Sequence, residues 1–245
     1  MATVTLTEPP EAFSCLLCAR PEWRNKAGDG CNECPAFKDT HFHPLSLGPE
    51  GADLIVVGDT PSPPPRLQLV GGRDMKPKST HETFEDTAGK VVKAAVQNVT
   101  SRREFQSLQV MYTYAVKCAV ENPNKKVVLS CSSNLRALIH KTAQRRQLAG
   151  RTTGIVVLAC GVHALTALGV QIRSEAEALN RMFENVDVGG VKVTVVFTRS
   201  LKAHATQDGK FNTLVSDVER ACRAATNSLV RVKTREEIEK DYVYP

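Results

Sequence analysis

The sequence predicts an α/β fold: three layers, with a central, mainly parallel four-stranded sheet flanked by helices and a cysteine-rich, metal-stapled N-terminal segment. The first observation is a set of short apolar runs bounded by glycine or polar residues, which is typical of buried parallel strands. The second is that stretches of helical composition separate these runs, as right-handed crossovers between parallel strands require. The four expected strands are Ala52–Gly58, Val110–Val116, Gly154–Ala159 and Val191–Phe197.

The expected helices are identified by apolar residues that recur on one side of each segment. They are Thr87–Thr100, Ser130–Gln147, Gly161–Leu168, Glu175–Phe183 and Asn212–Asn227. The loop Asp59–Arg66 contains consecutive prolines, which can neither pair in a sheet nor continue a helix. We expect a cysteine-rich segment at 1–50, one α/β domain at 51–228 and a charged tail at 229–245.

Composition restricts the classes of protein to which the chain can belong. Its 245 residues are 42% apolar and 24% charged, with a net charge of +6. These values are typical of a folded soluble domain and are compatible with a polyanionic partner. No apolar run reaches membrane-spanning length, so we expect an intracellular protein without a membrane partner. Aromatic residues make up only 5%, which argues against a broad stacking surface for single strands.

Eight cysteines in an expected intracellular chain indicate metal binding rather than disulfides. Cys15, Cys18, Cys31 and Cys34 have the spacing of a zinc ribbon, and spacing alone favours zinc. A competing set combines Cys31 and Cys34 with Cys118 and Cys131, since four thiolates can also hold a [4Fe–4S] cluster. In the simplest alternative, Cys118 and Cys131 are ordinary buried thiols, as we expect for Cys160 and Cys222.

Several motifs occur in an order that carries more information than any one of them. They are Cys31-Asn-Glu-Cys34-Pro, DLIVVGDTP at Asp53–Pro61, FEDTAG at Phe84–Gly89, the strand and turn at Val110–Asn124, Cys131 with Ser-Ser-Asn-Leu, Leu158–Gly169, and Val193–Ser200. Together they resemble the uracil-DNA glycosylase superfamily, specifically its iron–sulfur branch, often called family 4. The resemblance covers roughly residues 31–228.

The resemblance implies a [4Fe–4S] cluster held by Cys31, Cys34, Cys118 and Cys131, with a structural role. Cys15 and Cys18 become an extra pair, for which an additional or alternative zinc ion stays open. It also implies a DNA partner and a cellular compartment that contains DNA, such as the cytoplasm or nucleoid. Asp59 takes the position of the family's catalytic Glu, one methylene shorter, and Phe84 that of the residue that stacks on the flipped base.

Two positions depart from the family pattern. Tyr114 stands where an asparagine reads the uracil edge, which needs both a donor and an acceptor. Thr198-Arg199-Ser200 replaces His-Pro-Ser, so the histidine that stabilises the departing base is missing, although His204 could reach the site if the chain folds back. With Thr60, these residues form the expected base- and DNA-binding set: Thr60, Phe84, Tyr114, Thr198, Arg199 and Ser200.

Each of these residues also has a simple structural interpretation. Asp59 can cap its loop, Phe84 can pack in the core, and Tyr114 can fill the emptied pocket with its ring while its hydroxyl finds a backbone partner. The sequence therefore leaves two functions open. One is an enzyme that hydrolyses the N-glycosidic bond of a flipped, damaged or modified base through an altered pocket. The other is a catalytically inactive DNA-binding or protein-interaction member that retains the cluster. A third, a zinc-ribbon interaction module fused to an unrelated α/β domain, is distinguished by its metal content.

Overall fold

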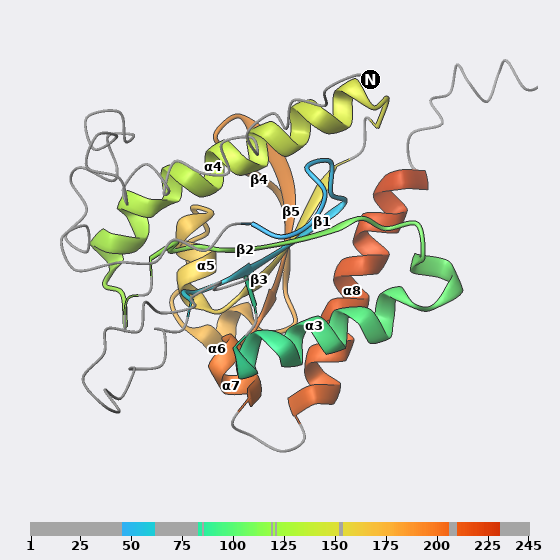
Figure 1. Ribbon diagram of the computed structural model, residues 1–245. Helices are drawn as coiled ribbons and strands as arrows, with labels where there is room; N and C mark the ends of the chain where they lie inside the picture. Colours follow the sequence, from blue (N-terminus) through green and yellow to red (C-terminus); the bar gives the residue numbers. More distant parts are fainter. Residues whose placement is uncertain are drawn as a thin grey trace, which may run out of the picture.

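The computed structural model describes residues 46–61, 83–84, 86–118, 120, 122–151, 154–205 and 210–230. It contains a five-stranded, mostly parallel mixed sheet in the order β2-β1-β3-β5-β4, packed against helices (Figure 1). β1, β2, β3 and β5 are parallel, and β4 pairs with β5 in the antiparallel sense. The strands are β1 (Leu54–Gly58), β2 (Val110–Tyr114), β3 (Ile155–Cys160), β4 (Met182–Val188) and β5 (Val191–Thr198).

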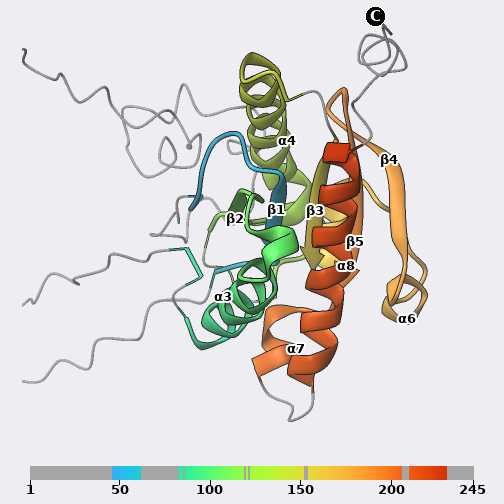
Figure 2. The same ribbon diagram turned by 90° about the vertical axis from the view of Figure 1, so that its right-hand side faces the viewer.

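Helices cover both faces of the sheet, as the sequence predicts (Figure 2). α4 and α5 pack on one face, and α3 and α8 pack on the other. The helices are α3 (Thr87–Thr100), α4 (Lys125–Leu148), α5 (Val162–Ala167), α6 (Glu175–Ala178), α7 (Leu201–Ala205) and α8 (Lys210–Val230), with a short 3₁₀ helix at Arg103–Phe105. None of the helices in the described ranges has both the length and the apolar character needed to cross a membrane.

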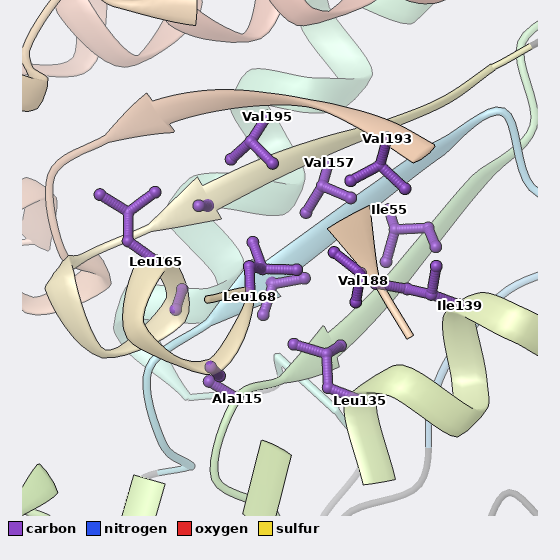
Figure 3. Close-up of a cluster of buried hydrophobic side chains, with 14 of the residues drawn as sticks. Ile55, Ala115, Leu135, Ile139, Val157, Leu165, Leu168, Val188, Val193 and Val195 are labelled. Carbon is purple, nitrogen blue, oxygen red and sulfur yellow. The ribbon is translucent and has the colours of Figure 1, made fainter. Parts of the chain in front are cut away.

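The strand β1 shows why the apolar runs have no alternation of polar residues. Its five residues are all buried: Ile55 and Val57 contact the layer that contains α4 and α5, whereas Leu54 and Val56 contact the layer of α3 and α8. Figure 3 shows part of the first layer, where Leu135 and Ile139 of α4 lie against the sheet. A strand with helices on both sides must be apolar on both faces.

One predicted element is wrong. From the sequence we expect a helix at Glu175–Phe183, but the helix α6 ends at Ala178 and the chain enters β4 at Met182. The sheet therefore has five strands rather than four. β4 and β5 form a hairpin whose turn is Gly189-Gly190, with φ of +64° and +88°. Positive φ at both turn residues matches the twist of a two-residue hairpin, and glycine adopts it without steric cost.

The sequence does not predict β4, because it is an exposed edge strand without a continuous apolar run. Only Val188 of its seven residues is buried. Its alternation is also broken by an irregularity between Phe183 and Val186. Three other boundaries move by a few residues. β2 ends at Tyr114 rather than Val116, α4 begins at Lys125, and α8 extends over Lys210–Val230.

The amino ends of the strands are held by a buried ionic group. Arg146 at the end of α4 and Asp53 before β1 are both about 1% exposed and form a salt bridge, while Arg151 reaches the same carboxylate at 3.2 Å. Asp53 also accepts the backbone N–H of Gln109 at 2.8 Å. These bonds fix the starts of β1 and β2 relative to α4. The carboxyl ends of the strands, at the opposite end of the sheet, are not involved in them and can form a site.

Most of the expected N-terminal segment lies outside the described residues, including Cys15, Cys18, Cys31 and Cys34. The tail from residue 231 does so too. Of the segment at 1–50, the structure describes 46–50, where Leu47 forms an isolated antiparallel bridge with Tyr112. This bridge lies on the outer edge of β2.

Candidate functional site at the carboxyl edge of the sheet

In a parallel α/β sheet the carboxyl ends of the strands meet at one edge, where ligands bind. Here that edge brings together the residues after β1, β2, β3 and β5. Most of the residues singled out from the sequence lie there: Asp59, Thr60, Tyr114, Cys118, Thr198, Arg199 and Ser200. Phe84, from the segment that precedes α3, packs onto Tyr114.

Asp59 follows β1 and lies over the beginning of α5. Its Oδ1 accepts the backbone N–H of Ala164 at 3.2 Å, and its side chain is 18% exposed. Gly161, which precedes α5, has a φ of +103°, and a Cβ at that position would collide with the Asp59 carboxylate. The glycine thus serves two purposes, because it adopts the left-handed conformation and leaves room for the carboxylate.

Burial raises the pKa of Asp59 to about 7. The backbone N–H groups of Ala164 and His163 oppose this effect, as does Lys202, whereas the nearby charge of Glu175 adds to it. Asp59 is therefore a partly exposed carboxyl group whose pKa lies close to neutral pH. Such a group can donate or accept a proton with little change in pH.

His163 is a neighbour of Asp59 that the sequence analysis does not identify. Its Nδ1 lies 4.0 Å from Asp59 Oδ1, its side chain is 37% exposed, and partial burial lowers its pKa. The distance is too long for a direct hydrogen bond but short enough for one water molecule to link the two groups. A histidine in the first turn after a predicted strand end is the signal that could have identified it.

Phe84 and Tyr114 stack directly on each other. Their ring centroids are 4.8 Å apart with 28° between the planes, and Tyr112 contacts Phe84 at 5.4 Å. The Tyr114 hydroxyl accepts the backbone N–H of Phe84 at 3.1 Å, and Phe84 has a φ of +63°. Phe84 and Tyr114 are 0% and 2% exposed. Tyr114 therefore occupies one face of Phe84 and also satisfies its backbone.

A buried polar chain lies at the end of β5. Thr198 Oγ1 is 3.0 Å from His204 Nε2, and the same hydroxyl bonds the carboxylate of Asp217 from α8. Because a hydroxyl has only one proton, Thr198 can donate to only one of these two groups at a time. Burial raises the pKa of Asp217, while Thr198, Arg220 and Arg199 oppose that shift. Arg220 pairs with Asp217 at 2.7 Å.

The chain does fold back after β5, because α7 carries His204 onto Thr198. His204 is only 5% exposed, so in this arrangement its ring binds Thr198 within the protein. Ser200 begins α7: its Oγ accepts the N–H of Ala203 at 3.4 Å. Asp217 was not identified from the sequence, although a carboxylate three residues after Leu214 on an apolar helix face is an unusual feature.

Thr60 lies at another part of this edge, near two of the four described cysteines, Cys118 and Cys131. The Thr60 hydroxyl lies 3.2 Å from the carbonyl oxygen of Val120 and 3.4 Å from that of Cys118, which joins the loops after β1 and β2. Cys131, in the second turn of α4, accepts the backbone N–H of Lys117 at 3.3 Å and the Asn134 amide at 3.6 Å. Cys131 therefore lies against Lys117, the residue that precedes Cys118.

Cys118 and Cys131 are two of the four cysteines that the sequence resemblance predicts as ligands of a [4Fe–4S] cluster. N–H donors directed at a cysteine sulfur stabilise its thiolate form and are common around iron–sulfur clusters. Within the described ranges no group of three or more His, Cys, Asp or Glu residues is placed to hold a metal ion. The other two expected ligands, Cys31 and Cys34, lie outside those ranges. Cys160 and Cys222 are fully buried, as expected of structural thiols.

No protein-family model matches the chain, and no curated protein matches it. The function must therefore be inferred from the site itself.

Proposed function

We propose that this chain is a DNA-binding protein with a uracil-DNA glycosylase-like α/β domain in which its own Tyr114 fills the base pocket. The observation that carries the proposal is the buried Phe84–Tyr114 stack at 4.8 Å. A glycosylase must hold an extruded base against an aromatic side chain. Where a tyrosine ring already lies at stacking distance, a base cannot take the same position.

The energetics of the stack support this proposal. Tyr114 is buried, and its hydroxyl satisfies the otherwise buried N–H of Phe84. Moving the Tyr114 ring away from Phe84 would expose both aromatic side chains and break that hydrogen bond. If this change resembles an aromatic-to-alanine substitution in a core, it costs about 3–5 kcal/mol. A flipped uracil would have to compensate this cost without the amide that normally reads its edge. The proposal therefore excludes efficient uracil excision.

The DNA-binding part of the proposal is supported by charge. The chain has a net charge of +6, and Arg199 and Lys202 follow β5 at the edge where the strand ends meet. Cations at this edge are suited to phosphate contacts. A [4Fe–4S] cluster on Cys31, Cys34, Cys118 and Cys131 would, when bound, join the N-terminal segment to the loop after β2. It would thereby stabilise the conformation of the loops at this edge.

The test uses purified protein and fluorescein-labelled oligonucleotides, single-stranded and duplex, with and without one uracil. Fluorescence anisotropy measures binding, and alkaline cleavage at abasic sites measures base release. We expect the protein to bind DNA with and without uracil with similar affinity and to release no uracil. Failure to bind any of them would overturn the proposal, and uracil release at substoichiometric protein would overturn its claim of a filled pocket.

A second candidate function is N-glycosidic hydrolysis of a base other than uracil, and the pair Asp59 and His163 favours it. Asp59 is partly exposed, its pKa is raised to about 7, and His163 Nδ1 lies 4.0 Å away. Such a pair can hold a water molecule and accept its proton as the sugar develops positive charge. Release of hypoxanthine or another modified base by wild-type protein, lost in Asp59→Asn, would establish this function in place of the first.

A further inference from the structure

The solvent-facing side of α4 is a cationic surface. Of its 24 residues, six are lysine or arginine and none is acidic: Lys125, Lys126, Arg136, Lys141, Arg145 and Arg146. At 100° per residue, Lys125, Lys126 and Arg136 fall within about one third of the helix circumference. All three are exposed, as are Leu129, Ser133 and His140 on the same side. We call Lys125, Lys126 and Arg136 the α4 stripe.

The cations of the stripe have no carboxylate partner among the described residues, unlike several other cations of the domain. In the parts of the chain that the structure describes, Lys125, Lys126 and Arg136 make no salt bridge. By contrast, Lys141 and Arg145 share Glu50, Arg102 and Arg223 share Glu219, and Lys192 pairs with Asp187. Arg146 is buried against Asp53. Among the described residues Arg103, Arg173 and Arg199 also make no salt bridge, but the stripe places three such cations together on one helix face.

The position of the two lysines also argues against a role in stability. Lys125 and Lys126 occupy the first turn of α4, and that turn has no acidic residue. The positive end of the helix dipole disfavours cations there. Asn124 already caps the helix by accepting the N–H of Val127 at 3.0 Å. The lysines therefore weaken the helix slightly, which is understandable if they bind an anion outside the protein.

The stripe begins at the proposed site. α4 follows the loop after β2, so Lys125 and Lys126 lie at the carboxyl edge, and the helix then runs along the face of the sheet toward its amino edge (Figure 1). Eleven residues of helix separate Lys125 from Arg136, a distance of about 16 Å. That length corresponds to roughly five base-pair steps of duplex DNA at 3.4 Å each. A chain of phosphates could therefore contact the whole stripe.

We propose that the α4 stripe binds the phosphate backbone of DNA that extends beyond the carboxyl edge. This inference rests on the proposed DNA binding and adds a path for the nucleic acid along α4. The contacts are electrostatic and read no sequence. Each phosphate contact releases counterions and contributes about 0.9 to the slope of log affinity against log salt.

The test compares wild type with the triple variant Lys125→Gln, Lys126→Gln, Arg136→Gln. The matched control is Arg102→Gln, Lys192→Gln, Arg223→Gln, which removes three charges that are 40%, 62% and 58% exposed and paired with carboxylates. Fluorescence anisotropy with a duplex of about 25 base pairs is measured across a series of KCl concentrations. Glutamine keeps the helix propensity of lysine and arginine, so α4 should be retained in the stripe variant.

We expect the stripe variant to lower the salt slope by about 2 to 3 and to bind about 10- to 100-fold more weakly near 0.1 M salt. The control should change the slope by less than about 1. The melting temperature of the stripe variant should equal or exceed that of wild type, which would exclude misfolding as the cause. A stripe variant with the slope of the control would overturn the inference while leaving the proposed DNA binding intact.

Two further outcomes would decide against the inference. Absence of DNA binding by wild-type protein would overturn it together with the proposed function. A parallel sedimentation assay uses vesicles containing about 30% phosphatidylserine. Vesicle binding that is lost in the stripe variant, together with unchanged DNA binding, would assign the stripe to a lipid surface instead.

Discussion

The carboxyl group of Asp59 should make the folded protein less stable as the pH rises, and Asp59→Asn should remove this effect. Burial raises the pKa of Asp59 to about 7, against an ordinary value of about 3.9 in an unfolded chain. Between these two values the folded state binds more protons than the unfolded state. Stability therefore falls as the pH rises from about 4 to 7, and the full cost is present above pH 7.

The size of the effect follows from the pKa difference. One pKa unit corresponds to about 1.36 kcal/mol, so the charged Asp59 costs at most about 4 kcal/mol above pH 7. The side chain is 18% exposed, and solvent reaching it reduces that figure. Asparagine has the same shape, and its Oδ1 can still accept the N–H of Ala164. We therefore expect Asp59→Asn to stabilise the protein by about 2–4 kcal/mol at pH 8 and by only about 1 kcal/mol at pH 5.

Denaturant unfolding at pH 5 and pH 8, followed by circular dichroism, measures both quantities. The control is Asp187→Asn, because Asp187 is exposed and hydrogen bonds from Gly190 and Lys192 lower its pKa. That variant should gain no stability at pH 8. If Asp59→Asn is destabilising at pH 8, or if its effect is the same at both pH values, the carboxyl group is an ordinary ionised cap of α5 and our description of the site is wrong. A gain at pH 8 would mark Asp59 as a residue retained at a cost in stability.

Three further predictions concern the other parts of the edge and its support. Tyr114→Phe should lower the free energy of unfolding by about 1–3 kcal/mol, because it leaves the buried N–H of Phe84 without an acceptor. Tyr112→Phe is the control, and equal losses of stability for the two variants in urea unfolding would contradict the prediction. Cys118→Ser should abolish the brown colour and the iron content of the purified protein, whereas Cys222→Ser should not; an unchanged visible spectrum would exclude Cys118 as a cluster ligand. Arg146→Met should lower the free energy of unfolding by about 3–5 kcal/mol, since Asp53 keeps only Arg151 and the Gln109 N–H as partners. Adding Asp53→Asn should recover part of that stability, and a double variant less stable than Arg146→Met alone would contradict this prediction.

Where each predicted element lies in the fold decides how well the sequence could predict it. The apolar runs of β1, β3 and β5 are buried on both faces, so their composition alone indicates parallel strands. β4 has one buried residue and an interrupted alternation, and the helical composition of Glu175–Ala178 just before it extended the predicted helix too far. The Gly189-Gly190 pair is the sequence signal for the hairpin, because glycine readily adopts the positive φ of a two-residue turn.

For the site, the sequence could show which residues follow the strands but not which of them touch. The family resemblance assigned Asp59, Phe84, Tyr114 and Thr198 to one expected site. The stacking of Phe84 on Tyr114 depends on the positive φ of Phe84 and the path of the chain before α3, and no local pattern encodes either. Asp217 approaches Thr198 only because α8 packs across the sheet end, a contact between residues 19 positions apart in the chain.

The filled base pocket is the central claim, and base flipping tests it most directly. Duplex DNA carrying 2-aminopurine next to a uracil fluoresces more strongly when a protein extrudes the neighbouring base. With wild-type protein at saturating concentration we predict no rise in fluorescence, because Tyr114 occupies the stacking position on Phe84. With Tyr114→Ala, which empties that position, we predict a rise at equal DNA occupancy. A rise with wild-type protein would contradict the account.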